Sequence, residues 1–156
     1  ARSPSGNWDI GNLSSPVTGL GQSPMHSPSA FNFFRPGYVP PLSALSAAGL
    51  VGPEFQITNE STVSSYVNFM QRAVSGQGLG DVRANYDGLT AIAGDSTALL
   101  NEINLVLAGG QVSAGTVGTL KVALDTISAS NEAGKLNRVQ AALVLVLASP
   151  EYIVQK

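Results

Sequence analysis

Apolar residues recur at spacings of three and four along the last two thirds of the chain, which is the period of a helix that buries one face. This period predicts four helices, near residues 59–74, 95–108, 113–128 and 131–148. Candidate capping residues stand at their starts, namely Thr58 or Asn59, Asp95 or Ser96, Ser113, and Asn131. In the second of these helices the expected inward face is Leu99, Ile103, Val106 and Leu107. The connections between the last three helices are short, so we expect these helices to pack antiparallel.

A shorter helix is predicted near residues 42–49, directly after a pair of prolines. Proline suits the first position of a helix because the N–H that it lacks has no partner there in any case, so Pro41 is the predicted start. Leu42, Leu45 and Leu50 would then face inward.

The first 41 residues show no helical period and hold seven of the nine prolines. Ser-Pro and Pro-Gly pairs mark turns and extended stretches. The aromatic side chains here carry large apolar areas that usually need a covering surface. We therefore predict a mainly α protein, in which an extended, proline- and aromatic-rich N-terminal strap (residues 1–41) precedes a small antiparallel helical bundle (residues 42–156), and the strap lies on the bundle or on a partner.

Charged residues make up only 12% of the chain, against roughly 25% in a typical soluble domain. Two interpretations stand: a surface of small polar residues, as in many secreted bacterial proteins, or a surface covered by other protein. The net charge of −2 and the absence of a basic cluster argue against nucleic-acid binding. The longest apolar run has eight residues, which predicts no membrane span. The sequence has no cysteine, which excludes disulfides and thiolate metal sites.

The strap contains the best candidates for contact with a partner or ligand: Asn32, Phe33, Phe34, Arg35 and Tyr38. An arginine between an aromatic ring and a proline can stack on a ring or bind a carboxylate through two hydrogen bonds. The same residues can instead lock the strap in place, so both interpretations stay open.

Two further candidates, Gly115 and Gly118, lie on the expected outer face of helix 113–128, where charged residues are usual. Glycine costs about 1 kcal/mol relative to alanine inside a helix. Close approach of another backbone would explain that cost, and a weak helix with a featureless surface is the alternative.

No motif in the chain supports catalysis. The single histidine, His26, lies in the strap with no nucleophile elbow near any serine. The glycines of residues 76–80 do not have the spacing of a dinucleotide loop. Residues 85–88 resemble the middle of a calcium loop, but Arg83 and Gly94 then occupy positions that need acids. The acids are scattered singly, so we predict no catalytic residue, no metal site and no cofactor.

Several short sequence segments of uncommon composition occur together in an order typical of one family. They are Gly21–Pro24, Ser27–Tyr38, Ala48–Val51, Pro53–Ile57, Asn59–Ser61 and Ser149–Lys156. Through these segments the chain resembles the bacterial "domain of unknown function 1800" proteins over nearly its whole length.

The resemblance implies that this chain is the C-terminal part of a longer, exported, largely helical protein. An N-terminus without methionine or signal peptide fits the same expectation. Such proteins are often encoded beside a sulfatase-like partner of the "domain of unknown function 1501" family. The implied location is periplasmic, cell-surface or extracellular. The family carries no established activity, so the resemblance assigns no catalytic residue.

Two functions follow as hypotheses. In the first, the chain is a non-catalytic interaction or structural module whose partner is the N-terminal portion of the same protein or another subunit. In the second, it is a supporting lobe of an enzyme whose active site lies in that N-terminal portion or in the sulfatase-like partner.

Overall fold

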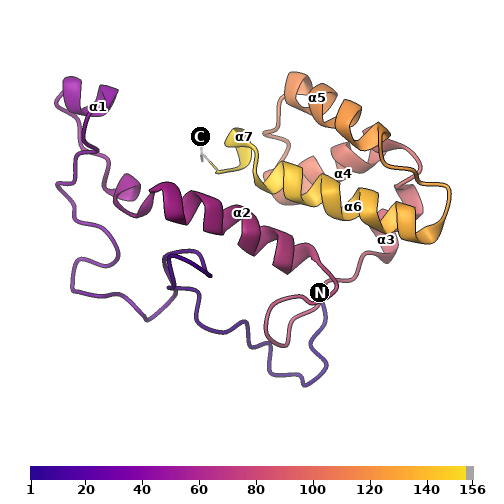
Figure 1. Cartoon of the computed structure of the whole chain (residues 1–156), viewed down its shortest axis with the longest axis horizontal. Coiled ribbons are helices and arrows are strands. Elements are labelled where there is room, and N and C mark those ends of the chain that lie inside the picture. Colours follow the sequence, from indigo (N-terminus) through magenta and orange to yellow (C-terminus); the bar gives the residue numbers. More distant parts are fainter. Residues whose placement is uncertain (154–156) are drawn as a thin grey trace. The chain divides into compact units, whose positions relative to one another are not determined.

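The structure is a computed structural model that describes residues 1–153. The described chain is mainly helical and contains no sheet, only isolated backbone bridges (Figure 1). The helices are α1 (Ala44–Ala47), the 3-10 helix η1 (Pro53–Ile57), α2 (Glu60–Val74), α3 (Asp87–Ile92), α4 (Ser96–Ala108), α5 (Ala114–Asp125), α6 (Glu132–Leu147) and α7 (Pro150–Ile153). Within the described residues, no helix combines the length and the hydropathy that crossing a bilayer requires.

The chain forms two compact units. Unit 1 comprises Ala1–Asp9 and Met70–Lys156, and it includes α3 to α7. Unit 2 comprises Ile10–Phe69, and it includes α1 and η1. Helix α2 begins in unit 2 and ends in unit 1.

Unit 1 is built around one hydrophobic core. Helix α4 contacts α3, α5 and α6, and α6 also contacts α3, α5 and α7 (Figure 1). The residues buried in this core are Val74, Ala93, Leu99, Leu100, Ile103, Ala108, Val112, Leu124, Val139, Ala142, Leu143, Val146 and Leu147. All of them belong to unit 1, which therefore has a hydrophobic core of its own.

Helices α4, α5 and α6 of unit 1 begin at capping residues that the sequence predicts. The Asp95 carboxylate accepts from the backbone N–H groups of Thr97 and Ala98, at 2.8 and 3.2 Å. Ser113 caps α5 and Asn131 caps α6 in the same way. Each cap satisfies an N–H group that has no partner within the helix, which fixes where the helix starts.

The structure differs from the sequence expectation on α4. Val106, predicted to face inward, is 67% exposed, and Leu107 is exposed as well. Leu100 is fully buried in their place, because the neighbouring helices of unit 1 cover the other side of α4. Helix α3 forms where no helix was predicted, and its Leu89 and Ile92 pack on the core.

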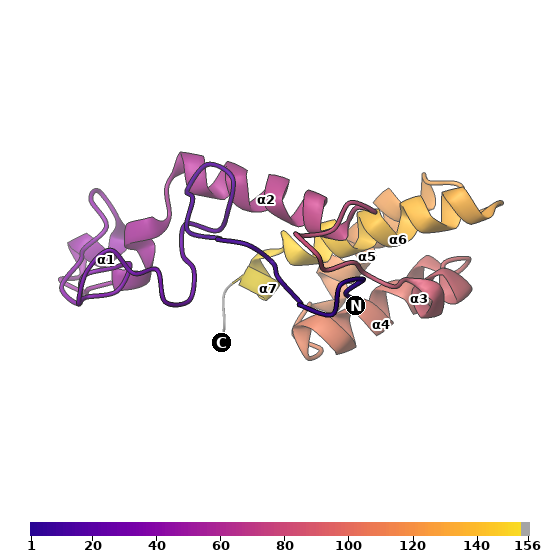
Figure 2. The same cartoon turned by 90° about the horizontal axis from the view of Figure 1, so that it is seen from below.

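The first residues of the chain join unit 1 through a loop near residue 80. Arg2 and Arg83 exchange two backbone hydrogen bonds, of 2.7 and 2.8 Å, and the N–H of Asp81 donates to the carbonyl of Asp9 at 2.8 Å. Figure 2 shows the N-terminal end beside this loop. Unit 1 is thus assembled from two segments that are distant in the sequence.

Unit 2 corrects the prediction for residues 42–49. Helix α1 has only four residues, and its N-cap is Ser43, whose hydroxyl oxygen accepts from the Ser46 N–H. Pro41 does not start the helix, because Leu42 has a left-handed φ of 53° and breaks the helical path between them. Leu42 and Leu50 are exposed rather than inward.

Candidate functional site

Unit 2 contains five of the seven candidate contact residues, all within Asn32–Tyr38. The strap is not straight there. The Asn32 N–H donates to the Ser29 carbonyl and the Tyr38 N–H to the Arg35 carbonyl, both at 3.1 Å, so the backbone turns twice. Asn32 has a left-handed φ of 64°, which asparagine tolerates better than most residues. Proline content alone suggested an extended path, but local hydrogen bonds bend it.

Asn32 and Phe33 line a hollow of about 550 Å³ in unit 2. The other lining residues are Leu13, Leu20, Gln22, Ser23, Pro24, Met25 and Ser27. Met25 is fully exposed and also has a left-handed φ, of 62°. No carboxylate, histidine or cation lines the hollow, so its hydroxyl and amide groups can bind a ligand but have no general acid or base beside them.

Arg35 and Tyr38 lie against η1. The Arg35 N–H donates to the Gln56 side-chain oxygen at 2.6 Å, and the Gly52 N–H donates to the Tyr38 carbonyl at 2.9 Å. A Cβ at Gly52 would lie 2.8 Å from a ring carbon of Phe55, so a larger residue there would displace that ring. Local sequence patterns do not reveal the roles of Gln56 and Gly52, because each contacts a residue that is far from it along the chain.

The aromatic side chains of the strap are only partly covered. Phe31 is 64% exposed, while Phe33, Phe34 and Tyr38 are half-buried. The Arg35 side chain is exposed. The covering surface that these rings require is therefore incomplete within the described chain.

Gly115 and Gly118 belong to unit 1, on the exposed side of α5. A Cβ at Gly118 would meet nothing within 4 Å, and one at Gly115 would meet only the Ser113 hydroxyl at 3.9 Å. No backbone of the described chain approaches these glycines. They are a free face of α5, beside Val122, which is also exposed.

Unit 1 also carries an apolar groove that the sequence does not predict. It has a volume of about 470 Å³ between α3 and α4. Its apolar lining residues are Leu89, Ile92, Ile103, Val106, Leu107 and Leu143. The exposure of Val106 and Leu107 follows from their place in this groove.

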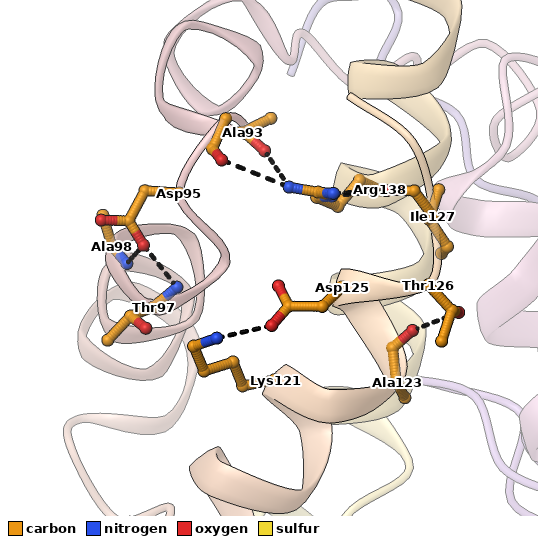
Figure 3. A network of polar contacts seen from close by, with 11 residues as sticks. Ala93, Asp95, Thr97, Ala98, Lys121, Ala123, Asp125, Thr126, Ile127 and Arg138 are labelled. Atoms are coloured by element: carbon orange, nitrogen blue, oxygen red, sulfur yellow. Dashed lines mark hydrogen bonds and ion pairs between the residues drawn. The ribbon is translucent and has the colours of Figure 1, made fainter. Parts of the chain in front are cut away.

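One cation is buried in unit 1. Arg138, on α6, is 7% exposed, and its guanidinium donates to the carbonyls of Ile127, Ala93 and Gly94 (Figure 3). These carbonyls lie just beyond the ends of α5 and α3, where helices leave acceptors without partners. Arg138 thus ties three helices together, which is a structural use of the charge.

Three carboxylates of unit 1 are held in the charged form by hydrogen bonds. The Ser3 and Ser5 hydroxyls donate to Asp81 and lower its pKa. The Thr116 hydroxyl, with that of Ser113, does the same for Glu151. Lys121 lowers the pKa of Asp125 (Figure 3). Each carboxylate serves to join segments of unit 1 or to stabilise a helix.

The described residues include no group of three or more histidines, cysteines or acids close enough to hold a metal ion. Tyr86 has a raised pKa because it is partly buried, and its hydroxyl donates to the Val74 carbonyl at 2.6 Å. This tyrosine joins the end of α2 to α3 within unit 1.

A family model described as "Protein of unknown function (DUF1800)" matches residues 2–154, which is nearly the whole chain. The chain belongs to the DUF1800 family. No curated protein matches the chain, and no solved structure does. The strap, η1 and the helices of unit 1 all fall within the DUF1800 match, so the candidate residues are part of the family's own region.

Proposed function

We propose that this chain is a non-catalytic interaction module that packs in a protein assembly, with unit 2 as its contact surface. The observation that carries the proposal is that Phe69 is the only buried apolar side chain among the 60 residues of unit 2. Leaving a large apolar side chain in water forgoes roughly 1.5–3 kcal/mol. Unit 2 leaves many of them exposed, including Phe31, Leu42, Leu50, Val51 and Phe55.

The same proposal includes the arrangement of the strap and of the helices that follow it. The strap lies on a surface that its aromatic side chains recognise, and the helices of residues 42–156 form a small antiparallel bundle. The covering surface is supplied by the N-terminal portion of the same protein or by another subunit of an exported bacterial assembly. The scarcity of charge supports this, because the centre of a protein interface is depleted in charged residues.

Amide hydrogen exchange tests the proposal. Exchange is compared between the isolated chain and the chain within its native assembly, with unit 1 as the internal reference. We expect residues 10–69 to exchange more slowly in the assembly, because covered amides are protected. Equal exchange of unit 2 in the two samples would refute the proposal.

A matched pair of variants sharpens the test. Phe31→Ser and Val122→Ser both replace an exposed apolar side chain, the first in unit 2 and the second on α5. We expect Phe31→Ser to weaken assembly by about tenfold or more, as for an aromatic anchor, and Val122→Ser to leave it unchanged. If Val122→Ser weakened assembly and Phe31→Ser left it unchanged, the contact surface would be assigned to unit 1.

The second candidate function is a supporting lobe of an enzyme whose active site lies elsewhere, in an N-terminal portion or in a sulfatase-like partner. The hollow beside Asn32 favours it, because two left-handed residues line that hollow and strained backbone often gathers at functional sites. Its test is the activity of the full-length protein. Loss of activity in Arg35→Ala with unchanged stability would favour the supporting lobe over the interaction module.

A further inference from the structure

The surface around Arg35 has a charge pattern that limits what can cover it. We call this surface the Arg35 patch: Phe34, Arg35, Tyr38, Glu54 and Phe55. The hydrogen bonds from Arg35 to Gln56 and from Gly52 to Tyr38 hold the strap beside η1, so Arg35 and Glu54 belong to the same patch.

Charge is unusually scarce around this patch. Only three of the 60 residues of unit 2 carry a charged side chain, namely Arg35, Glu54 and Glu60. A typical soluble domain of that length would have about 15. Arg35 and Glu54 are both exposed, and among the described residues neither side chain takes part in an ion pair. The patch therefore presents one free cation and one free anion, with the partly open rings of Phe34, Tyr38 and Phe55 beside them.

A partner must complement both charges. A surface of one sign would satisfy either Arg35 or Glu54 and repel the other. A second copy of the chain, related by two-fold symmetry, can complement both charges, because an isologous interface brings the same patch from both copies together. Arg35 of one copy then faces Glu54 of the other, and the reverse pair forms by symmetry. Guanidinium–carboxylate pairs are strong because two parallel hydrogen bonds join the groups.

We propose that the Arg35 patch is a homodimer interface, covered by the same patch of a second copy of this chain. The inference rests on the proposed function in that it takes unit 2 as the contact surface, and it names the partner. The two intermolecular pairs fix the register of the copies, and the aromatic rings between them supply the apolar contact.

Charge reversal tests the interface in sedimentation equilibrium of the purified chain. We expect wild type to dimerise in the micromolar range, and Arg35→Glu and Glu54→Arg each to weaken dimerisation by roughly 100-fold, because each single change places like charges together twice. The double variant Arg35→Glu/Glu54→Arg restores the dimer with its charges exchanged. An equimolar mixture of the two single variants forms a heterodimer, which also shows that both variants are folded.

The control is Glu60→Arg, the same reversal at the third charged residue of unit 2, at the first position of α2. It leaves dimerisation unchanged. Two outcomes overturn the proposal: a wild-type chain that stays monomeric up to roughly 1 mM, or a dimer that both single reversals leave intact. Protection of residues 10–69 in the native assembly, together with a monomeric isolated chain, would retain the interaction module and assign its surface to a different protein.

Discussion

Unit 1 and unit 2 differ in where their apolar side chains lie. In unit 1 the helices that follow residue 86 enclose a core of thirteen buried residues, and two of the exposed apolar residues, Val106 and Leu107, line one groove. In unit 2 a comparable supply of leucine, valine and aromatic residues remains mostly in contact with water. The difference predicts that unit 1 can fold by itself, and it fits the proposal that unit 2 gains stability from a surface outside itself.

Their polar groups differ in the same way. Unit 1 uses side chains to join distant segments, as in Ser3 to Asp81 and Thr116 to Glu151. In unit 2 many of the hydrogen bonds from side chains span only two or three residues, as in Ser29 to Phe31 and Ser43 to Ser46. Local bonds shape turns but do not hold a unit together. The following four predictions test this contrast, from the largest expected effect to the smallest.

The largest difference is expected for the same substitution in both units. Leu99→Ala removes a fully buried side chain from α4 of unit 1, and the cavity left behind lowers the free energy of unfolding by about 2–5 kcal/mol. Leu42→Ala removes a fully exposed side chain from unit 2 and changes that free energy by no more than about 0.5 kcal/mol. Urea unfolding followed by circular dichroism measures both. Equal losses would show that unit 2 buries Leu42 in solution.

The second prediction concerns arginine. Arg138→Met leaves the carbonyls of Ile127, Ala93 and Gly94 without their donor and lowers the free energy of unfolding by about 2–4 kcal/mol. Arg35→Met is the matched control, because its guanidinium is exposed in unit 2, and we expect less than about 0.5 kcal/mol. Thermal unfolding at low protein concentration separates the two variants. A stable Arg138→Met protein would mean that the guanidinium is not needed to tie the helices.

The third prediction compares two helix caps. Ser113→Ala removes the acceptor for the Thr116 N–H and a donor to Glu151, so we expect a loss of about 1 kcal/mol. Ser43→Ala removes the cap of α1, a helix of four residues that buries nothing, and a loss of about 0.3 kcal/mol or less is expected. Chemical unfolding of both variants beside wild type tests this. Losses in the opposite order would contradict the contrast between the units.

The smallest effect is a local one at low pH. Because hydrogen bonds from Ser3 and Ser5 lower the pKa of Asp81 in the folded protein, its contribution to stability is present above the unfolded pKa, about 3.9, and is lost as the pH falls through the folded value. Residues 1–9 then loosen from the loop near residue 80. Trp8 is the only tryptophan of the chain, and its backbone N–H donates to the Ser3 hydroxyl, so its fluorescence reports the change.

Asp81→Asn should show the acid form of this signal already at pH 7. Asp87→Asn is the control, because Asp87 lies at the start of α3. A fluorescence transition that is unchanged by Asp81→Asn would assign the acid response to another group.

Much of unit 1 could be predicted because its signals are local. Asp95, Ser113 and Asn131 each bond to an N–H two or three residues ahead, which the sequence makes visible. The exposure of Val106 could not be predicted, because helical period identifies apolar positions but not which neighbouring helices cover them. Helix α3 has only six residues, one of them Gly88, and its formation depends on packing against the core.

The candidate site was less accessible to prediction. Composition identifies Phe34 and Arg35 as candidates. The hydrogen bond from Arg35 to Gln56 joins residues 21 positions apart, and no periodic pattern in the sequence indicates it. The left-handed turn at Asn32 replaces the expected extended path, since proline content does not state where turns fall. Whether these residues contact a partner stays a prediction that the dimer experiment addresses.

The pairing of residues 1–9 with the loop near residue 80 has a consequence for biosynthesis. During translation Arg2 leaves the ribosome about 80 residues before Arg83, a wait of roughly 4–16 s at 5–20 residues per second. For that interval the N-terminal segment has no partner, and all of unit 2 is made before unit 1 can close. Within the described residues the nascent chain therefore exposes the apolar side chains of residues 10–69 before unit 1 is complete, and a chaperone can bind them during that interval.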